Sequence, residues 1–350
     1  MAASNASNAK TSFATALNTA LRDALSDDLV VIFGEDVGVA GGVFRITDGI
    51  ARDFGEERCF DTPLAESGIV GFAIGMAMSG FKPVVEMQFD AFAYPAFEQI
   101  TSHVAKMRNR TRGSISLPLV IRVPYAGGIG GVEHHCDSSE AYYAHTPGLK
   151  VVTPGTVADA YTLLRAAIAD PDPVVFLEPK RLYWSTAELD LTTLEPAQLG
   201  QAAVRRTGSD VTLVAYGPSL PVAMQAAAAA QADHGWDVEV VDVRSIVPFD
   251  DATVVASVRK TGRCVVVQEA QGFAGVGAEI AARVTERAFH DLAAPVLRVS
   301  GLDIPYPYPK LEHHHLPGVD RVLDAMARLQ WDDRPDPRWL SGPTGAQVTS

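Results

Sequence analysis

Short runs rich in Val, Ile, Leu and Phe alternate with Ala-rich stretches over most of the chain. Nearly continuous apolar strands that alternate with helices are typical of a parallel sheet covered on both faces. The pattern therefore predicts an α/β fold. In the first half, strands are expected at 29–33, 82–89, 117–123, 149–154 and 173–179, and helices at 12–26, 66–79, 95–109 and 156–169.

The alternation stops after residue 180 and resumes near residue 210. A chain of 350 residues commonly forms two domains. We predict a first domain over 11–185, a linker over 186–208, a smaller α/β domain over 209–335 and a flexible tail over 336–350. In the second domain, strands are expected at 211–216, 237–243, 263–269 and 295–300, and helices at 219–233, 250–260 and 276–290.

Charge and composition narrow the class of protein. The net charge is -13, whereas nucleic acids and anionic membranes are bound by clustered Lys and Arg, so neither is an expected partner. Cys59, Cys136 and Cys264 lie far apart, which fits a reducing compartment. Neither a secretory signal nor a membrane-spanning run is found, so we expect a cytoplasmic protein.

Several polar residues directly follow predicted strands, where the ligands of open parallel sheets gather. Glu35 follows the strand at 29–33, Gln88 ends the strand at 82–89, and a loop over 124–139 follows the strand at 117–123. We expect these groups to meet at one edge of the first domain. From its position alone, Glu35 could equally be a site residue or an acid that only ends a strand or caps a helix.

Glu66 stands where the chain enters a Gly-rich helix that looks packed on every side. Gly68, Gly71 and Gly75 recur at helical spacing, so they share one face. Each glycine costs a helix about 1 kcal/mol relative to Ala, which is understandable where a backbone or a flat ligand approaches closely. On pattern alone, Glu66 is either an acid that caps the helix or an acid that faces such a ligand.

The segment "YAGGIGGVEHHCDSSEAYYAH" (125–145) combines four glycines with two adjacent histidines. No HxH or HxxxH spacing accompanies His134 and His135, so a zinc site is a weak interpretation. A general acid or base on a loop that lines a pocket fits one of them better. We interpret His134 as a solvated loop residue and His145 as structural.

Two further motifs carry no function in this interpretation. "GFAGVG" (272–277) lacks the spacing of the dinucleotide fingerprint. "LEHHH" (311–315) runs on into "LPGVDRVL", so we read it as native surface, with metal binding as a minor alternative.

Five motifs, in order and spacing, resemble the β subunit of the thiamine-diphosphate-dependent 2-oxo acid dehydrogenase decarboxylase component, and most of all its branched-chain type. They are "VIFGEDVGVAGGVFR", "FDTPLAESGIVGFAIG", "QFDAFAYPAFEQI", "HHCDSSEAYYAHTPGLKVVTP" and "EPKRLY". The resemblance covers about residues 11–335. It implies a transketolase-like fold, with a pyrimidine-binding domain and a smaller C-terminal α/β domain, in an α2β2 heterotetramer.

The resemblance also implies roles for single residues. Glu66 matches the glutamate that hydrogen-bonds N1′ of the thiamine aminopyrimidine, and Phe92 matches the aromatic residue that packs on that ring. Leu64 and Gln88 match residues that line the ring, and Glu35 matches an acid near the cofactor. His135 matches the histidine that faces substrate and supports acyl transfer to the lipoyl group. The family often has Ser where this chain has Cys136, which leaves the orientation of His135 open.

The resemblance assigns the rest of the cofactor to the α subunit. The GDG…NN signature that holds Mg2+ and the diphosphate is missing from this sequence, so the chain should be inactive alone. A lipoyl-bearing acyltransferase is the implied acceptor. Some β subunits also hold a structural K+, which would map here to Leu117, Leu119, Val120, Ala167, Asp170 and Asp172.

Other functions remain as alternatives. Within the class, pyruvate or acetoin could replace the branched-chain 2-oxo acid as substrate. An NAD-dependent oxidoreductase would need a glycine fingerprint after the first strand, which "VIFGEDVGVAGG" does not supply. A scaffold without catalysis would not need both Glu66 and His135.

Overall fold

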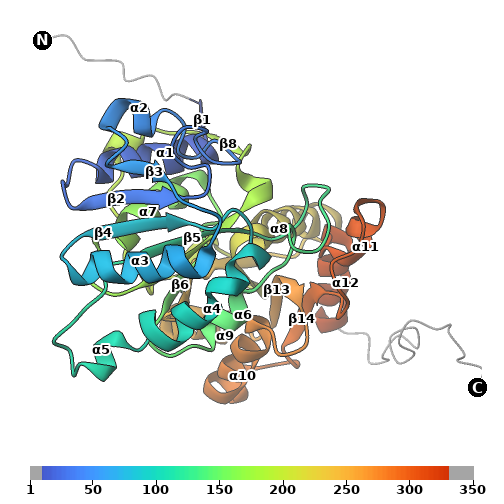
Figure 1. Ribbon diagram of the computed structural model, residues 1–350. Coiled ribbons are helices and arrows are strands. Elements are labelled where there is room, and N and C mark those ends of the chain that lie inside the picture. Colours follow the sequence, from blue (N-terminus) through green and yellow to red (C-terminus); the bar gives the residue numbers. More distant parts are fainter. Residues whose placement is uncertain (1–9, 331–350) are drawn as a thin grey trace, which may run out of the picture.

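The computed structural model describes residues 10–330 of the chain. The predicted tail and the last residues of the predicted second domain, 331–350, lie outside the described residues. Figure 1 shows two sheets side by side, one built by the first half of the chain and one by the second half. The predicted α/β fold with two parallel sheets is confirmed.

Within residues 10–330, the larger sheet has seven strands in the order β12-β6-β7-β5-β4-β2-β3. All neighbours are parallel except β12 and β6. The strands are β2 (Val30–Gly34), β3 (Cys59–Asp61), β4 (Lys82–Glu86), β5 (Val120–Tyr125), β6 (Lys150–Val152), β7 (Val174–Pro179) and β12 (Ser245–Val247).

Helices cover both faces of this sheet because successive strand residues point to opposite sides. Val30 and Ile32 of β2 pack toward α1 (Phe13–Ala24) and α7 (Val157–Ala169), whereas Val31 and Phe33 pack toward α3 (Glu66–Met78). Strands buried on both faces read as continuous hydrophobic runs, which is why the sequence predicted them.

The helix predicted over 95–109 is instead a series of short turns. A 3-10 helix over Ala91–Ala96 leads into α4 (Phe97–Gln99), a π-helical turn over Ile100–Val104 and α5 (Met107–Arg110). Pro95 lies inside the first of these turns. Because proline offers no N–H to a helix interior, a regular α-helix cannot run through this position.

The second sheet, within the described part, has five strands in the order β14-β13-β10-β11-β9, all parallel except β9 with β11. Its strands are β9 (Ala203–Arg206), β10 (Val211–Ala215), β11 (Val238–Asp242), β13 (Cys264–Gln271) and β14 (Leu297–Gly301). It is flanked by α8 (Leu220–His234), α9 (Asp251–Thr261), α10 (Val276–Ala288) and α12 (Val319–Gln330).

The two halves are joined more closely than a linker implies. Within 186–208, β8 (Thr186–Glu188) pairs with β1 (Lys10–Ser12), and β9 joins the second sheet. In return, β12 from the second half adds an antiparallel edge strand to the first sheet. The domain boundaries at residues 185 and 208 stay a prediction. Strands β8, β9 and β12 each pair across the predicted division or lie within the predicted linker.

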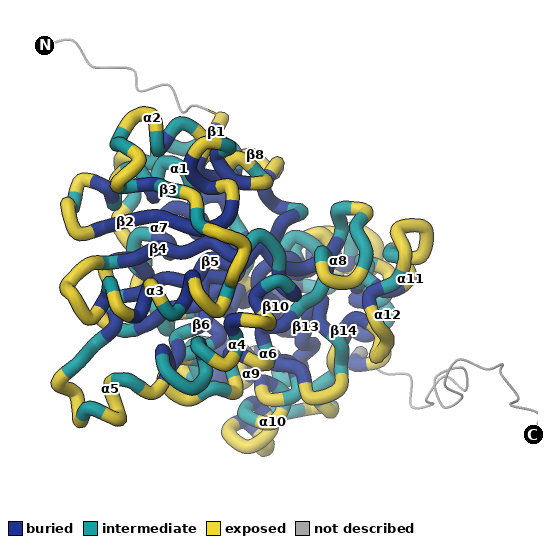
Figure 2. The backbone as a smooth tube through the Cα atoms, viewed as in Figure 1, coloured by how far each residue is buried: buried dark blue, intermediate teal, exposed yellow. Residues whose placement is uncertain are grey.

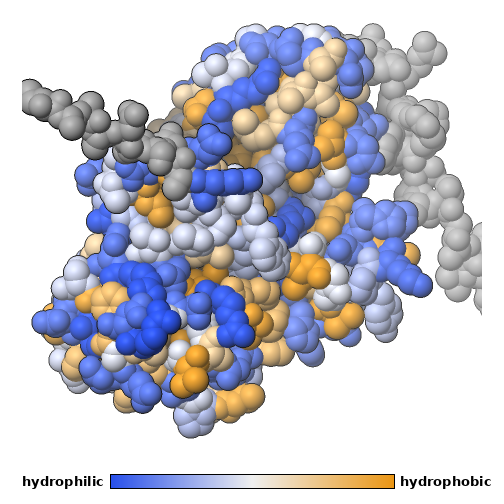
Figure 3. Space-filling view, turned by 90° about the horizontal axis from the view of Figure 1, so that it is seen from above, coloured by the Kyte–Doolittle hydropathy of each residue, from blue (hydrophilic) through white to orange (hydrophobic). Residues whose placement is uncertain are grey.

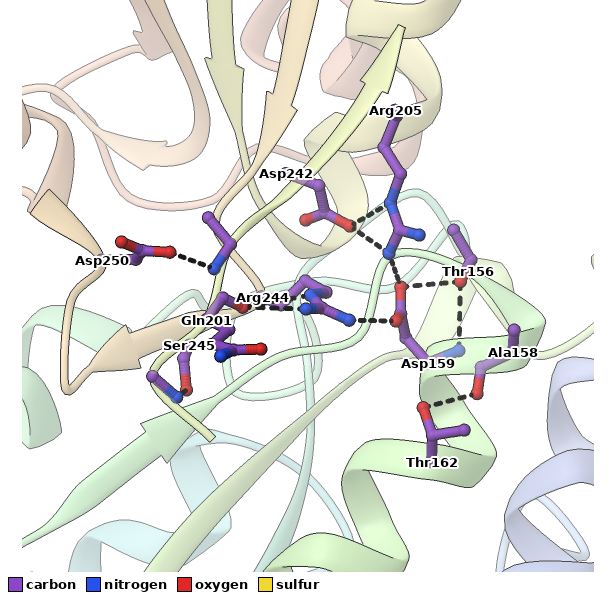
Figure 4. Close-up of polar contacts among 12 residues, drawn as sticks. Thr156, Ala158, Asp159, Thr162, Gln201, Arg205, Asp242, Arg244, Ser245 and Asp250 are labelled. Carbon is purple, nitrogen blue, oxygen red and sulfur yellow. Dashed lines mark hydrogen bonds and ion pairs between the residues drawn. The ribbon is translucent and has the colours of Figure 1, made fainter. Parts of the chain in front are cut away.

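A buried group of charges ties the halves together (Figure 4). Asp159 in the first turn of α7 pairs with both Arg205 of β9 and Arg244, and Arg205 also pairs with Asp242 at the end of β11. Charges that leave water must be paired and hydrogen-bonded. This cluster therefore links helix α7 of the first half to β9 and β11 of the second sheet.

Several short elements carried no sequence signal strong enough to predict. They are α2 (Ile50–Phe54), α6 (Glu140–Ala144), α11 (Glu312–His315) and the 3-10 turns Lys180–Leu182, Leu191–Thr193, Gly217–Ser219, Phe289–Asp291 and Pro309–Leu311. Each is too short for the hydrophobic periodicity of a helix to repeat.

The described surface mixes hydrophobic and hydrophilic side chains. Among residues 10–330, no helix combines the length and apolarity needed to span a bilayer. On the face seen in Figure 3, hydrophobic side chains form separate small groups among hydrophilic ones. In Figure 2, the central strands of the two sheets are buried, whereas α3 shows exposed turns on its outer side.

Candidate active site

The predicted site residues lie where the central parallel strands end. Glu35 follows β2, Gln88 follows β4 and the loop that carries His135 follows β5. Lys180 follows β7 in the same way. The carboxyl ends of neighbouring parallel strands meet at one edge of a sheet, and the structure therefore brings these segments together.

Glu66 is the first residue of α3 and is half-buried. The preceding residue, Ala65, provides no side-chain hydrogen bond to the helix. A carboxylate at this end of a helix is stabilised by the helix dipole. The capping interpretation is thus compatible with the structure, but Glu66 also stands on the edge where the other site residues gather.

The prediction that α3 is packed on every side is wrong for this chain. Phe72 is 54% exposed and Leu64, just before the helix, is 78% exposed. A Cβ atom added to Gly71 or Gly75 would meet nothing within 4 Å. The outer face of α3 is therefore apolar and open. The helix sequence lacks the polar residues that usually mark a solvent-exposed face.

Glu35 is a buried acid with an unpaired atom. Its side chain is 8% exposed, and Oε1 has no hydrogen-bond partner. Burial, followed by the neighbouring charges of Glu66 and Asp36, raises the pKa of Glu35. A buried polar atom without a partner is costly, so a proton or a ligand at Glu35 would be favourable.

Gln88 is held next to this acid. Its amide Nε2 donates to Oδ2 of Asp36 at 2.9 Å, and Asp36 follows Glu35 in a left-handed conformation with φ of 57°. Left-handed conformations are unusual for residues other than glycine. The Gln88 amide thereby orients the turn that carries Glu35.

Phe92 and His135 meet across the site. Their ring centroids lie 5.3 Å apart at an interplanar angle of 70°, and Phe89 contacts His135 at 4.5 Å in a similar edge-on geometry. Such T-shaped contacts are favoured between aromatic rings. The imidazole is half-buried against two phenyl rings, while the exposed His134 has a φ of 72° and His145 is exposed at the end of α6.

Cys136 points into the protein rather than into the site. It is 1% exposed, and a Cβ on Gly131 would lie 2.7 Å from its Sγ. Burial raises the pKa of Cys136 to about 11, so the group is a neutral thiol near pH 7. It acts as packing under the glycine loop and not as a nucleophile.

Two buried charged residues behind the site, Asp90 and Lys180, were given no role by the sequence analysis. Asp90 accepts hydrogen bonds from the backbone N–H of Ser139, at 2.9 Å, and from its hydroxyl. Lys180 is fully buried, and its Nζ has no hydrogen-bond partner. Burial raises the pKa of Asp90 to about 7 and lowers the pKa of Lys180 to about 8. The available signal was that each residue directly follows a strand predicted from the sequence, at 82–89 for Asp90 and at 173–179 for Lys180.

The residues present fit an aminopyrimidine ring. Phe92 offers a flat aromatic face, Leu64 an apolar contact, Gln88 an amide, and the acids Glu66 and Glu35 can each share a proton with a ring nitrogen. Nothing comparable is offered to a divalent cation, since residues 10–330 contain no group of three His, Cys, Asp or Glu side chains placed to hold one.

The potassium site implied by the resemblance stays a prediction. Lys150 donates to both carboxylate oxygens of Asp170, at 2.7 and 2.6 Å, and Arg108 pairs with Asp172. The carbonyls of Leu117, Leu119 and Ala167 already accept backbone hydrogen bonds. Val120 lies within β5. The side chains of Asp170 and Asp172 are thus neutralised by Lys150 and Arg108, and any cation here would depend on backbone carbonyls alone.

The "LEHHH" motif is only partly on the surface. His313 and His314 are exposed, but His315 is 2% exposed and packs edge-on against Tyr306 with 5.2 Å between ring centroids. Its interpretation as native surface is thus wrong for His315. Burial lowers the pKa of His315.

Comparison with known proteins agrees with this architecture. Residues 9–185 match the transketolase pyrimidine-binding domain, and residues 200–322 match the transketolase C-terminal domain. A solved structure, a split-gene transketolase described as an inactive β4 tetramer, has the same fold, with a TM-score of 0.74 and 23% identity over 91% of this chain and 97% of that chain.

Two relatives are 54% identical to this chain over most of their length. The 3-methyl-2-oxobutanoate dehydrogenase subunit beta of Mycobacterium tuberculosis (strain CDC 1551 / Oshkosh) is 54% identical over 90% of each chain. The pyruvate dehydrogenase E1 component subunit beta of Leifsonia xyli subsp. xyli (strain CTCB07) is 54% identical over 89% of this chain and 93% of its own. The chain therefore belongs to the family of 2-oxo acid dehydrogenase E1 β subunits, which carry a transketolase pyrimidine-binding domain and a transketolase C-terminal domain.

Proposed function

We propose that this chain is the β subunit of a decarboxylase that oxidatively decarboxylates branched-chain 2-oxo acids and transfers the acyl group to a lipoyl group. In that reaction the 2-oxo acid loses CO2, the lipoyl disulfide is reduced, and the products are an S-acyl dihydrolipoyl group and CO2. The observation that carries the proposal is the meeting of Glu66, Glu35, Gln88, Phe92 and His135 at one sheet edge.

Each of these residues has a proposed role. Glu66, supported by the buried Glu35, holds a proton at N1′ of the aminopyrimidine. Phe92 and Leu64 pack against the ring, and Gln88 fixes the turn at Glu35. His135 faces the substrate and transfers a proton during acyl transfer to the lipoyl group. Thiamine diphosphate, when bound, supplies the carbon nucleophile and the electron sink that decarboxylation of a 2-oxo acid requires.

An α subunit is the proposed partner in an α2β2 heterotetramer. It would hold the diphosphate and Mg2+, and for the metal the described residues contain no group of three His, Cys, Asp or Glu side chains that could bind it. The open face of α3 supports this partner, because Leu64 and Phe72 are exposed beside glycines that let a second backbone approach. A lipoyl-bearing acyltransferase is the proposed acceptor, and the cytoplasm is the proposed location.

Pyruvate is the second candidate substrate, because a pyruvate dehydrogenase relative is as similar as the branched-chain relative. Acetoin is a third within the same class. We favour the branched-chain acid from the "EPKRLY" motif over 178–183. An NAD-dependent oxidoreductase is disfavoured because β2 is not followed directly by a helix, and a scaffold is disfavoured by the assembled site.

The proposal is tested by turnover of the reconstituted αβ pair. Rates on 3-methyl-2-oxobutanoate, pyruvate and acetoin are compared with thiamine diphosphate, Mg2+ and a lipoyl domain present. Faster oxidation of 3-methyl-2-oxobutanoate is expected, and faster pyruvate oxidation would overturn the substrate assignment. Binding of NADH by the isolated chain, without thiamine diphosphate binding by the pair, would overturn the class. A neighbouring reading frame with GDG…NN would identify the partner.

A further inference from the structure

The histidine loop, defined as residues 126–137, is tied to the C-terminal half of the chain. Its ends meet in a hydrogen bond from the Ala126 N–H to the Asp137 carbonyl, at 2.8 Å. The Gly127 N–H donates to Oε1 of Glu269 in β13 at 2.5 Å, and the Gly128 N–H donates to the hydroxyl of Tyr306 at 3.1 Å. Two adjacent amides in the first domain thus depend on side chains from the second half.

Neighbouring side chains leave no room for a Cβ atom at Gly127 and Gly128. A Cβ on Gly127 would lie 2.0 Å from the Tyr306 hydroxyl oxygen, and one on Gly128 would lie 2.8 Å from Cδ of Arg181. Gly128 also has a φ of 82°, which favours glycine. The loop is therefore held against Tyr306 and Arg181 rather than moving freely.

Tyr306 is well suited to hold the loop. Its side chain is 5% exposed, and its hydroxyl donates to Oε2 of Glu312 at 2.7 Å while it accepts from Gly128. Burial raises the pKa of Tyr306, so the hydroxyl keeps the proton that Glu312 accepts. One oxygen atom thereby joins α11 to the loop.

We propose that Tyr306 is a positioning residue, which orients His135 toward the Phe92 ring through its hydrogen bond to Gly128. This inference rests on the proposed function, in which His135 serves acyl transfer. The loop runs from Gly128 to His135 without an intervening helix or strand, and Gly131 packs on Cys136 directly beside that histidine. A shift at Gly128 is therefore passed on to the imidazole.

The test compares Tyr306→Phe with Tyr308→Phe, a nearby tyrosine that is 71% exposed. In the complex with the α subunit, reductive acylation of a lipoyl domain is measured beside decarboxylation with an artificial electron acceptor. Tyr306→Phe should lower the ratio of acylation to decarboxylation about tenfold, equivalent to ~1.4 kcal/mol, and Tyr308→Phe should not. Hydrogen–deuterium exchange of 126–137 should quicken only in Tyr306→Phe.

An unchanged ratio, or unchanged exchange in the loop, would overturn the inference. If Tyr306→Phe does not fold, Glu312→Ala leaves the tyrosine ring in place and removes the acceptor that orients its hydroxyl toward Gly128, and smaller changes in the same direction are expected. A wild-type complex without activity on any 2-oxo acid would instead refute the proposed function, and the exchange measurement would still decide whether Tyr306 holds the loop.

Discussion

The carboxyl of Glu35 lies buried within the electrostatic reach of Glu66. Burial first, and then the charge of Glu66, raises the pKa of Glu35, whose Oε1 has no hydrogen-bond partner. Two acids 31 positions apart in the sequence thus lie close together, one after β2 and one at the start of α3. A buried acid with a raised pKa beside a second acid is typical of sites that hold or move a proton.

Replacing Glu35 by Gln should stabilise the folded chain at neutral pH. Because the pKa of Glu35 is raised in the folded state, that state binds more protons than the unfolded one between the two pKa values, and stability falls as the pH rises through this window. The melting temperature of Glu35→Gln should exceed that of the wild type at pH 8, and the gap should close in acid. Equal melting curves at both pH values would contradict the assignment.

Breaking the ionic core under the site should be far more damaging. Arg122 is fully buried and pairs with Glu86 at 2.6 Å and with both oxygens of Glu178, at 2.6 and 2.9 Å. Arg122→Met would leave two buried carboxylates unpaired, and we expect it to lower the free energy of unfolding by about 3–5 kcal/mol. Arg52→Met, at an exposed arginine, is the matched control and should change denaturant midpoints little.

The open glycine face of α3 should matter for assembly and not for the fold. A Cβ on Gly75 meets nothing within 4 Å, so Gly75→Ala should raise the stability of the isolated chain by up to about 1 kcal/mol. Gly75→Leu should weaken binding to the α subunit, measured by sedimentation or calorimetry. Ala228→Leu, on the exposed side of α8, provides the control. Unimpaired binding by Gly75→Leu would place the partner elsewhere.

The architecture was predictable from sequence because its strands are buried on both faces. Val30, Val31, Ile32 and Phe33 form one apolar run, although they pack into two different cores. The irregular helix over 91–110 could have been suspected from Pro95, but its π-helical turn could not. The transfer of β12 to the first sheet has no local signal, since a strand of three residues acquires its partner only through tertiary contacts.

The site residues were predictable where the resemblance to a known family named them. The burial and pairing of the surrounding charged residues were less predictable, because they depend on tertiary packing. The resemblance named His135 and Phe92, whose rings contact each other in the structure, and the predicted exposure of His134 is confirmed. Lys180 looked like one more polar residue after a strand, and its burial without a partner depends on the loop folded over it. The pairing of Lys150 with Asp170 was likewise invisible, because the two residues lie 20 positions apart.

Changing His135 should separate the two half-reactions. His135→Ala removes the imidazole between Phe89 and Phe92. We expect reductive acylation of a lipoyl domain by the assembled complex to fall about 10²–10⁴-fold, the range for loss of a general acid–base group, with a smaller effect on decarboxylation measured with an artificial acceptor. His134→Ala, at the exposed neighbour, should leave both rates near wild type.

The most direct measurement is turnover of a 2-oxo acid by the complex assembled with Glu66→Gln, beside the exposed neighbour Ser67→Ala. An amide of nearly the same size keeps the helix start but cannot hand a proton to a ring nitrogen. We predict normal assembly with decarboxylation reduced about 10²–10⁴-fold, and wild-type rates for Ser67→Ala. Near-normal decarboxylation by correctly assembled Glu66→Gln would contradict the role given to this carboxyl.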